Sequence, residues 1–214
     1  MKVVACVPIK LNNERLPHKN TKILGGKPLI NYILSSLDKT EKIDNIYVYC
    51  SDDSINKYIT GRAEFLRRDK SLDEPTAIFT DIFDKFTSSV NADVYVLAHA
   101  TAPFITTEII NDCVERVLSG KNDSAFSARK IQEFLWQDNR PLNFEADKIP
   151  RSQDLIPIYI ETCGLYAFKK EVYFNSKRRI GESPYIREVS LKEAIDIDNP
   201  EDFEFASIML NTKF

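Results

Sequence analysis

A cationic loop is the first feature of this chain whose residue types point to chemistry. Between Lys10 and Lys27 the sequence holds five Lys and Arg residues and a single acid, Glu14, although the formal net charge of the chain is −3. This segment, the phosphate loop, follows an apolar run at residues 3–7 and precedes a helical pattern. α/β proteins bind phosphate groups where the first strand ends and the next helix begins. The loop therefore predicts a site for a polyanion such as a triphosphate, and a solvated basic loop is the alternative.

The phosphate loop lacks the glycine-rich signatures of the common nucleotide-binding folds. Neither G-x-G-x-x-G nor G-x-x-x-x-G-K-[ST] occurs in the chain, which argues against dinucleotide-binding and P-loop proteins. Asn12 and Asn13 can take the turn or left-handed geometry that glycine otherwise supplies. Lys10 and Lys19 are the cations that we expect to hold the phosphates.

Two aspartates late in the sequence form the second pattern. The order Ile-Asp-Ile-Asp at residues 195–198 predicts a strand that buries the isoleucines and presents Asp196 and Asp198 on one face. Two such carboxylates repel each other unless a cation lies between them, and Mg²⁺ takes one or two carboxylates together with substrate phosphate oxygens. The pair therefore predicts a Mg²⁺ (or Mn²⁺) site. The alternative is that Asp198 only caps or charges the helix that begins near Pro200.

His99 and Arg151 have side chains suited to binding a second substrate. His99 follows the apolar run at residues 94–98, which predicts a place at the carboxyl edge of the sheet, where open α/β sheets bind ligands. A structural histidine is the alternative. Arg151 lies in a polar turn, where its planar fork can clamp a carboxylate, and Gln153 would share its face. A surface ion pair, for instance with Glu161, is the alternative for Arg151.

Composition favours an ordinary globular domain. With 214 residues, 43% of them apolar and 29% charged, the chain is predicted to form a single domain, 1–214. Its acidic balance argues against a nucleic-acid binder, and no apolar run approaches the roughly 20 residues that span a membrane. The first residues of the chain have the pattern of a strand and not that of a secretion signal. The four cysteines are widely spaced. We therefore expect a cytoplasmic protein with buried, reduced thiols.

Strand and helix patterns alternate through most of the chain. The predicted strands are residues 3–9, 46–50, 63–66, 94–98, 124–128, 159–168 and 188–197. The predicted helices are residues 28–38, 53–59, 76–90, 106–119 and 200–210. This alternation predicts an α/β fold with a mainly parallel sheet covered by helices.

The alternation breaks at residues 131–159, which hold the single tryptophan and three of the ten prolines. This segment is too short to fold alone, so we interpret it as a hairpin or arm inserted into the sheet domain. Its apolar side chains cannot be buried within it and predict a protein interface; they are Phe134, Leu135, Trp136, Leu142 and Phe144.

These segments, in this order, resemble the acylneuraminate cytidylyltransferase family, which covers CMP-sialic acid synthetases and their relatives for other nonulosonic acids. CMP-Kdo synthetases are more distant. The match spans nearly the whole chain. It is carried by Pro17, Lys19, Asn20, Lys27-Pro28-Leu29-Ile30, Ser51-Asp52, Arg68, Thr76-Ala77, Thr101, Pro103, Arg151, Gln153-Asp154, Gly164-Leu165-Tyr166 and Asp196-Ile197-Asp198.

The resemblance implies a Rossmann-like, three-layer nucleotidyltransferase fold, and a homodimer in which the arm, residues 131–159, reaches over the partner's site. Lys19 matches the lysine that stabilises the triphosphate, and the two aspartates match the metal ligands. Arg68, Thr76 and Ala77 fall where cytosine and ribose are held. The expected nucleotide-binding residues are thus Lys10, Asn12, Asn13, Lys19, Asn20, Arg68, Thr76 and Ala77, and the expected acceptor-binding residues are His99, Thr101, Arg151, Gln153 and Glu161.

The chain departs from the family pattern at several positions. Lys10 replaces the usual Arg, which keeps the charge but loses the fork geometry, and Asn12-Asn13 replace Gly-Ser or Asn-Ser. His99 replaces a Gln that commonly contacts the sugar. Glu161 and Cys163 lie where sialic acid enzymes tend to carry Arg and Asn. These departures concern the acceptor more than the nucleotide.

The predicted function is a cytidylyltransferase that couples CTP to a carboxylated keto-sugar, a sialic acid-like nonulosonic acid, and releases pyrophosphate. Lys19 is expected to neutralise phosphate charge, and Asp198 to accept the proton of the attacking hydroxyl, directly or through a water on the metal. One alternative is a cytidylyltransferase for Kdo or another acceptor. Others are a nucleotide-sugar-binding glycosyltransferase, whose D-x-D usually precedes an acceptor domain, and a binding module without chemistry, against which the intact Lys19, Asp196 and Asp198 argue.

Overall fold

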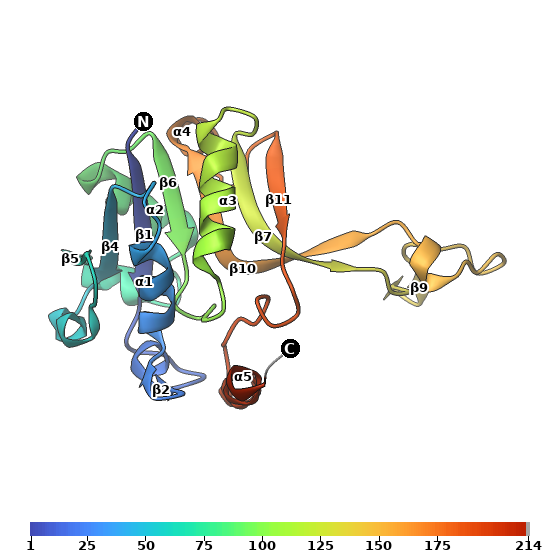
Figure 1. Ribbon diagram of the computed structural model, residues 1–214, viewed down its shortest axis with the longest axis horizontal. Helices are drawn as coiled ribbons and strands as arrows, with labels where there is room; N and C mark the ends of the chain where they lie inside the picture. The colour runs from blue at the N-terminus through green and yellow to red at the C-terminus, as the bar shows by residue number, and fades with distance from the viewer. Residues whose placement is uncertain (213–214) are drawn as a thin grey trace.

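The computed structural model describes residues 1–212 and is built on a seven-stranded sheet (Figure 1). In spatial order the strands are β11 (Pro184–Glu188), β7 (Ser124–Ile131), β10 (Ile158–Lys169), β6 (Val94–Ala98), β1 (Val3–Ile9), β4 (Asn45–Cys50) and β5 (Ala63–Arg67). β10 runs antiparallel to both of its neighbours, and the other four pairs are parallel. The mainly parallel sheet is therefore confirmed.

Helices cover both faces of this sheet, which completes the predicted three layers. One face packs against α1 (Ile30–Asp38) and α3 (Thr107–Leu118), and the other against α2 (Phe79–Ser89) and α4 (Lys170–Ser176) (Figure 1). Each helix turns an apolar stripe towards the strands, because apolar residues recur every three or four positions. In α1 these buried residues are Ile30, Ile33, Leu34 and Leu37. Burial of one such side chain stabilises the fold by roughly 1.5–3 kcal/mol.

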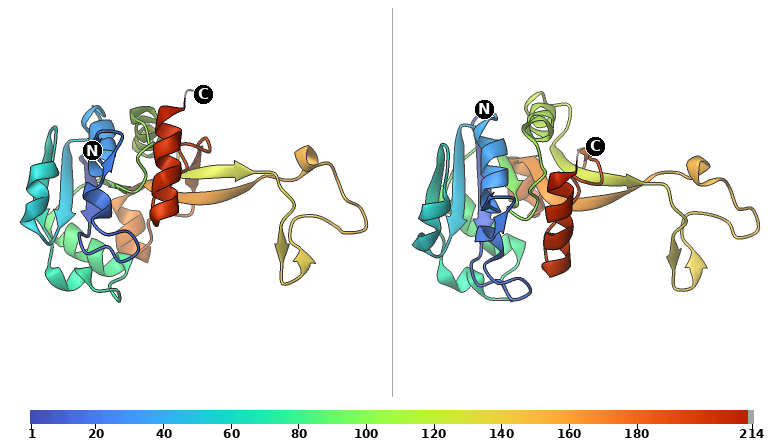
Figure 2. Two further views of the ribbon diagram at one scale, coloured as in Figure 1. Left: turned by 90° about the horizontal axis from the view of Figure 1, so that it is seen from below. Right: turned by 60° about the horizontal axis from the view of Figure 1, so that its bottom comes forward.

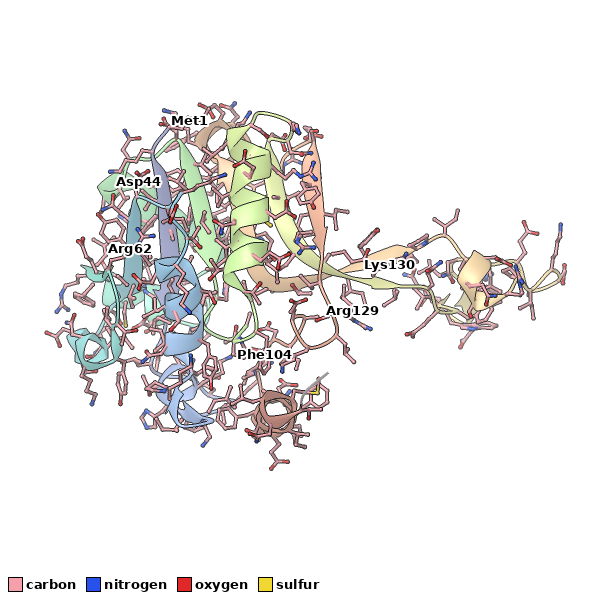
Figure 3. The ribbon with its side chains drawn as sticks, viewed as in Figure 1. Met1, Asp44, Arg62, Phe104, Arg129 and Lys130 are labelled. Atoms are coloured by element: carbon pink, nitrogen blue, oxygen red, sulfur yellow. The ribbon has the colours of Figure 1, made fainter. Side chains whose placement is uncertain are left out.

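A third apolar cluster lies below the carboxyl edge of the sheet, where α5 (Pro200–Asn211) is placed (Figure 1). Phe104 faces α5 from the turn after β6 (Figure 3) and packs in a cluster with Leu24, Ile197 and Met209. Leu24 belongs to the short strand β2 (Ile23–Leu24), which pairs with β3 (Lys27–Pro28) inside the phosphate loop. The cluster thus holds the phosphate loop beside the residues that precede α5.

The start of α5 is a capping box that also fixes the backbone of Asp198. The Asn199 side chain accepts a hydrogen bond from the Asp202 N–H at 3.1 Å. The Asp202 carboxylate accepts the N–H groups of Asn199 at 3.0 Å and of Asp198 at 2.8 Å. Caps of this type contribute about 1 kcal/mol. The cap belongs to Asn199, so the capping role that the sequence also allowed for Asp198 is wrong.

Most predicted elements are confirmed with small shifts at their ends, and one strand is wrong. β11 ends at Glu188, and residues 189–199 form a turn and an irregular segment. The apolar alternation at 195–198 arises because Ile195 and Ile197 are buried in the cluster below the sheet, and not because they belong to a ladder. The helix predicted at 53–59 is a 3₁₀ helix, Asp53–Tyr58, and α4 was not predicted.

Residues 132–157 form an arm that projects away from the sheet (Figures 1 and 2). It leaves β7 after Arg129 and Lys130 (Figure 3) and carries the hairpin of β8 (Trp136–Gln137) and β9 (Arg140–Pro141). The two turn residues between β8 and β9 both have positive φ, as the type I′ hairpin turn requires. Large apolar side chains are exposed along the arm, namely Phe134, Trp136, Leu142, Ile149 and Ile156. The segment predicted at 131–159 contains this arm and also the strand residues 131, 158 and 159, and its role in dimerisation stays a prediction.

The expectation about thiols holds for three cysteines and fails for the fourth. Cys6, Cys50 and Cys113 are buried and free. Cys163 is exposed, because its φ of 57° lies at an irregularity of β10, between Glu161 and Tyr166, that turns the side chain outward. None of the helices within residues 1–212 is long and apolar enough to cross a membrane.

Candidate functional site

The phosphate loop is shaped by a left-handed residue and a side-chain bond. His18 has φ 56° and precedes a 3₁₀ turn, Lys19–Thr21, that folds the chain back. The buried Asn20 donates its side-chain amide to the Lys10 carbonyl at 2.8 Å. Asn20 therefore closes the loop, and it brings Lys10 and Lys19 to the same part of the molecule.

Lys19 and Asp198 meet although they are far apart in the sequence. Lys19 Nζ donates to Asp198 Oδ1 at 2.9 Å, and Arg15 Nη2 lies 3.0 Å from Asp198 Oδ2. The Lys19 side chain is only 11% exposed, so its charge is directed at this site and not at bulk water. Burial alone would raise the pKa of Asp198, but the hydrogen bond and charge of Lys19, with the charge of Arg15, hold it below its usual range. Asp198 is therefore ionised and paired.

Asp196 lies beside this ion pair in a different environment. Its Oδ1 atom is buried and has no hydrogen-bond partner among the described residues. Burial, with the Asp198 charge as a smaller contribution, raises the pKa of Asp196. The Ile197 N–H donates to the Thr101 carbonyl at 2.8 Å. This bond ties the two aspartates to the turn after β6, where Thr101 was predicted to contribute to the site.

The two carboxylates fit a hard divalent cation that shares its coordination with phosphates. Within residues 1–212 no group of three His, Cys, Asp or Glu could enclose a metal by itself. Mg²⁺ does not need one, because it takes one or two carboxylates, substrate phosphate oxygens and waters. The unpartnered Oδ1 of Asp196 is one suitable donor, and Asp198 supplies a second that is shared with Lys19 and Arg15.

A polar cleft of about 1250 Å³ opens beside the phosphate loop. One wall is the loop itself, including Asn12 and His18, and the other consists of residues after β4 and β5, including Ser51, Arg67 and Asp73. Its position at the carboxyl ends of β1, β4 and β5 is where ligands of open α/β sheets bind. The cleft is large enough for a nucleoside triphosphate.

Arg68 lies behind the wall of this cleft. Its guanidinium is almost fully buried, pairs with Asp73 and lies 5.8 Å from the ring centre of Tyr49. Ser51 also donates to Asp73. Arg68 therefore positions Asp73, which lines the cleft, while its own Nε has no partner among the described residues. Thr76 and Ala77 follow in the segment before α2, and neither lines the cleft.

His99 follows β6 and lies beside a second, smaller cavity. Its N–H donates to the Gly164 carbonyl at 3.1 Å, and its Nε2 is buried without a partner among residues 1–212. Burial, reinforced by the charges of Arg179 and Lys19, lowers the pKa of His99 to about 4. The imidazole is therefore neutral near pH 7. The cavity, of about 220 Å³, is lined by His99, Arg179 and the apolar or sulfur-bearing Cys6, Pro8, Phe79, Ile82, Phe83 and Leu97.

Gly164 allows this part of the site to close. A Cβ at this position would lie 2.9 Å from the Ala102 Cβ, which is closer than carbon atoms approach. β10 can therefore lie against the turn after β6 only because residue 164 is glycine. The close approach makes the His99–Gly164 bond possible.

Glu161 forms a partly buried cluster with Arg179 and Tyr166. Its Oε1 accepts a hydrogen bond from Arg179 Nη2 at 2.8 Å and another from the Tyr166 hydroxyl. The Arg179 guanidinium lies 4.0 Å from the ring centre of Tyr166. Sequence reasoning missed Arg179, because no motif marks it. The one available signal was Glu161, since an acid in such a pocket needs a cation nearby.

Arg151 and Gln153 lie on the arm, apart from His99 within one chain (Figure 1). Arg151 donates to Asp154 at 2.7 and 3.0 Å, and its side chain is 73% exposed. The ion pair between Arg151 and Glu161 that the sequence allowed is therefore wrong. Gln153 belongs to a 3₁₀ turn, Ser152–Asp154, and not to an extended segment that would share a face with Arg151.

Comparison with known proteins assigns the chain to a family. A family model described as "Cytidylyltransferase" matches residues 4–210. The CMP-N,N'-diacetyllegionaminic acid synthase of Legionella pneumophila is 27% identical over 220 residues, covering 95% of this chain and 94% of that protein. The pseudaminic acid cytidylyltransferase of Campylobacter jejuni is 23% identical over 224 residues, with 98% and 96% covered. An N-acylneuraminate cytidylyltransferase of Oncorhynchus mykiss is 25% identical over 179 residues.

The comparisons also bear on length and fold. The chain spans about half the length, 41–52%, of the N-acylneuraminate cytidylyltransferases that it matches first. Its fold is similar to that of a CMP:2-keto-3-deoxy-manno-octonic acid synthetase solved with CTP, with a TM-score of 0.71, 16% identity and 98% of both chains covered. The predicted resemblance to acylneuraminate cytidylyltransferases is confirmed, and the chain belongs to the cytidylyltransferase family.

Proposed function

We propose that this protein transfers CMP from CTP to the anomeric hydroxyl of a carboxylated keto-sugar of the nonulosonic acid class. The hydroxyl oxygen bonds to the α-phosphorus, the bond from that phosphorus to the β-phosphate bridge breaks, and pyrophosphate leaves. The observation that carries the proposal is the buried Lys19 paired with Asp198 beside Asp196, whose Oδ1 atom has no partner among residues 1–212. Names of relatives that act on pseudaminic, legionaminic and acylneuraminic acids support the acceptor class.

The cations of the phosphate loop would bind the triphosphate. Without a nucleotide, Lys19 and Arg15 neutralise Asp198. The phosphate oxygens of CTP can compete for these two cations, because a triphosphate carries more charge than one carboxylate. Lys10 would add a third cation from the start of the loop. Catalysis would then consist of positioning and charge neutralisation.

Asp196 and Asp198 would hold Mg²⁺ (or Mn²⁺), which supplies charge neutralisation at the α-phosphate. Lys19 and Arg15 hold the pKa of Asp198 below its usual range, and a bound cation would act in the same direction. Asp198 would accept the proton of the attacking hydroxyl, directly or through water. As a carboxylate it is a weak base, so this transfer would come late, when the new phosphorus–oxygen bond is largely formed.

The acceptor would lie beside His99, between the phosphate loop and β10. The neutral imidazole can donate or accept one hydrogen bond to a sugar hydroxyl without adding charge. We also propose a homodimer in which the arm, with Arg151 and Gln153, reaches the partner's site. The exposed apolar side chains of the arm support this assembly.

A pyrophosphate-release assay tests the proposed function. The four ribonucleoside triphosphates are each combined with N-acetylneuraminic, pseudaminic, legionaminic and 2-keto-3-deoxy-manno-octonic acids in the presence of Mg²⁺, and products are identified by mass spectrometry. We expect CTP alone to react, and one acceptor to dominate. Turnover with UTP equal to that with CTP, or no release with any pair, would reject the proposal.

A further inference from the structure

Arg179 is held rigidly at the wall of the smaller cavity. One donor, Nη2, bonds Glu161 at 2.8 Å, and the guanidinium carbon lies 4.0 Å from the centre of the Tyr166 ring and 5.6 Å from that of Phe79. The side chain is 29% exposed, so it contacts solvent only along one side. A planar cation fixed by one carboxylate and two rings has lost most of its rotamer freedom before any ligand arrives, which lowers the cost of binding one.

Most hydrogen-bonding capacity of Arg179 is unused. A guanidinium has five N–H donors, and within residues 1–212 Glu161 is the only group that accepts from Arg179. The other residues that line the cavity are apolar or sulfur-bearing, apart from His99. The remaining N–H groups of this planar side chain match the two oxygens of a carboxylate, which accept two parallel bonds.

The cavity lies on the acceptor side of the reaction centre. His99 and Arg179 both line it, and the His99 N–H is bonded to the Gly164 carbonyl of β10. The larger cleft, on the side of β4 and β5, is lined by the phosphate loop and by neither His99 nor Arg179. A substrate in contact with Arg179 would therefore lie beside His99 and outside the larger cleft.

We propose that Arg179 binds the carboxylate of the acceptor sugar, and that Glu161 holds and neutralises the guanidinium until the acceptor arrives. This inference rests on the proposed function and deepens it by naming the residue that selects the acid. Tyr166 keeps Glu161 in place through its hydroxyl, so Glu161 can share Arg179 with the substrate without leaving its position. The competing assignment is Arg151 on a partner's arm.

A comparison of the acceptor acid with its methyl ester tests this assignment. The probe is whichever acid of the panel reacts best with the parent protein. The parent should prefer the acid over the ester. Arg179→Gln should raise the KM for the acid tenfold or more. The KM for the ester and the KM for CTP should change less than twofold. Arg178→Gln is the matched control, because Arg178 is exposed and, among residues 1–212, pairs only with Glu182. Arg151→Gln is measured in parallel.

Glu161→Gln tests whether Glu161 neutralises Arg179 before the acceptor binds, and it should change the acceptor KM in the opposite direction from Arg179→Gln. Glutamine keeps an oxygen that can accept from Tyr166 but removes the charge that competes for Arg179. The acceptor KM should fall severalfold for the acid and stay unchanged for the ester. A rise in the KM of both compounds would mean that Glu161 contacts the sugar itself, and would overturn its role as a placeholder.

Two outcomes would overturn the role of Arg179. One is an acid-over-ester preference that survives Arg179→Gln, and the other is a preference that is lost in Arg151→Gln and kept in Arg179→Gln. Thermal unfolding of every variant is recorded, and if Arg179→Gln is unfolded then Arg179→Lys, which keeps the charge and loses the fork, is compared in the same way. Failure of the proposed function is distinct from these results, because then the parent itself releases no pyrophosphate.

Discussion

The role of Lys19 can be tested by replacing it with methionine, which keeps the apolar stem and removes the charge. Lys19 Nζ is 2.9 Å from Asp198 Oδ1 and its side chain is 11% exposed, so no solvent cation can easily replace it. A charged contact to a transferring phosphoryl group is worth about 3 kcal/mol, so kcat/KM for CTP should fall about a hundredfold or more. Pyrophosphate release under saturating acceptor measures this loss.

The fold should survive this substitution. Asp198 is 41% exposed and keeps Arg15 as a partner, so unfolding by urea should shift by only about 1 kcal/mol. The pKa of Asp198 is lower in the folded protein than in the unfolded chain. The stabilisation from the Lys19–Asp198 pair is therefore complete above the unfolded pKa, and it is lost as the pH falls through the folded pKa. The stability of parent and variant should therefore converge in acid. Lys85→Met, on the exposed face of α2, is the control. A loss of kcat/KM of less than tenfold in Lys19→Met would refute the reasoning.

Three further predictions concern the metal, the histidine and the arm. Asp196→Asn and Asp198→Asn should each raise the Mg²⁺ concentration for half-maximal activity about tenfold or more; metal titrations that superimpose on the parent would contradict this. The pKa of His99 is lowered from 6.5 to about 4 in the folded protein, so the unfolded state binds the extra proton and stability should fall by up to about 3 kcal/mol from pH 6.5 to pH 4. His99→Gln should lack this part of the decline in urea unfolding, and equal slopes would contradict the assignment. Light scattering at micromolar concentration should give a dimer for the parent and a monomer when residues 133–156 are replaced by a short glycine linker; a monomeric parent would reject the arm as an interface.

The sequence was most informative where local pattern and burial agree. β1 and β6 were predicted with their observed ends, because every residue but one in these strands is buried and the runs are bounded by polar loops. The order of strands in the sheet could not be read in this way, since the antiparallel insertion of β10 depends on contacts between distant segments. The same limit applies to Arg179, whose partner Glu161 is 18 residues away and on another element.

The failed strand at residues 188–197 shows why a two-residue period is ambiguous. Ile195 and Ile197 belong to an apolar cluster, and the aspartates that alternate with them do not, just as in a strand with one buried face. The backbone, however, makes one bond to the Thr101 carbonyl and otherwise leads into the cap of α5. Alternation reports which side chains are buried, and it does not report whether a neighbouring strand is present. The placement of the two aspartates was thus inferred from a correct burial pattern and a wrong element.

The antiparallel pairing of β7 with β10 has a consequence for how the arm can change. Past Ala128 the partner β11 has ended, and only the ribbon of residues 129–131 and 158–160 continues from the sheet. Because the two strands leave side by side, two residues added to each would lengthen the reach by roughly 7 Å and leave every facing side chain where it was. One residue added to each would turn the inner face outward. The length of the arm can therefore change during evolution by two residues per strand at a time, while the seven-stranded sheet and its helices stay unaltered.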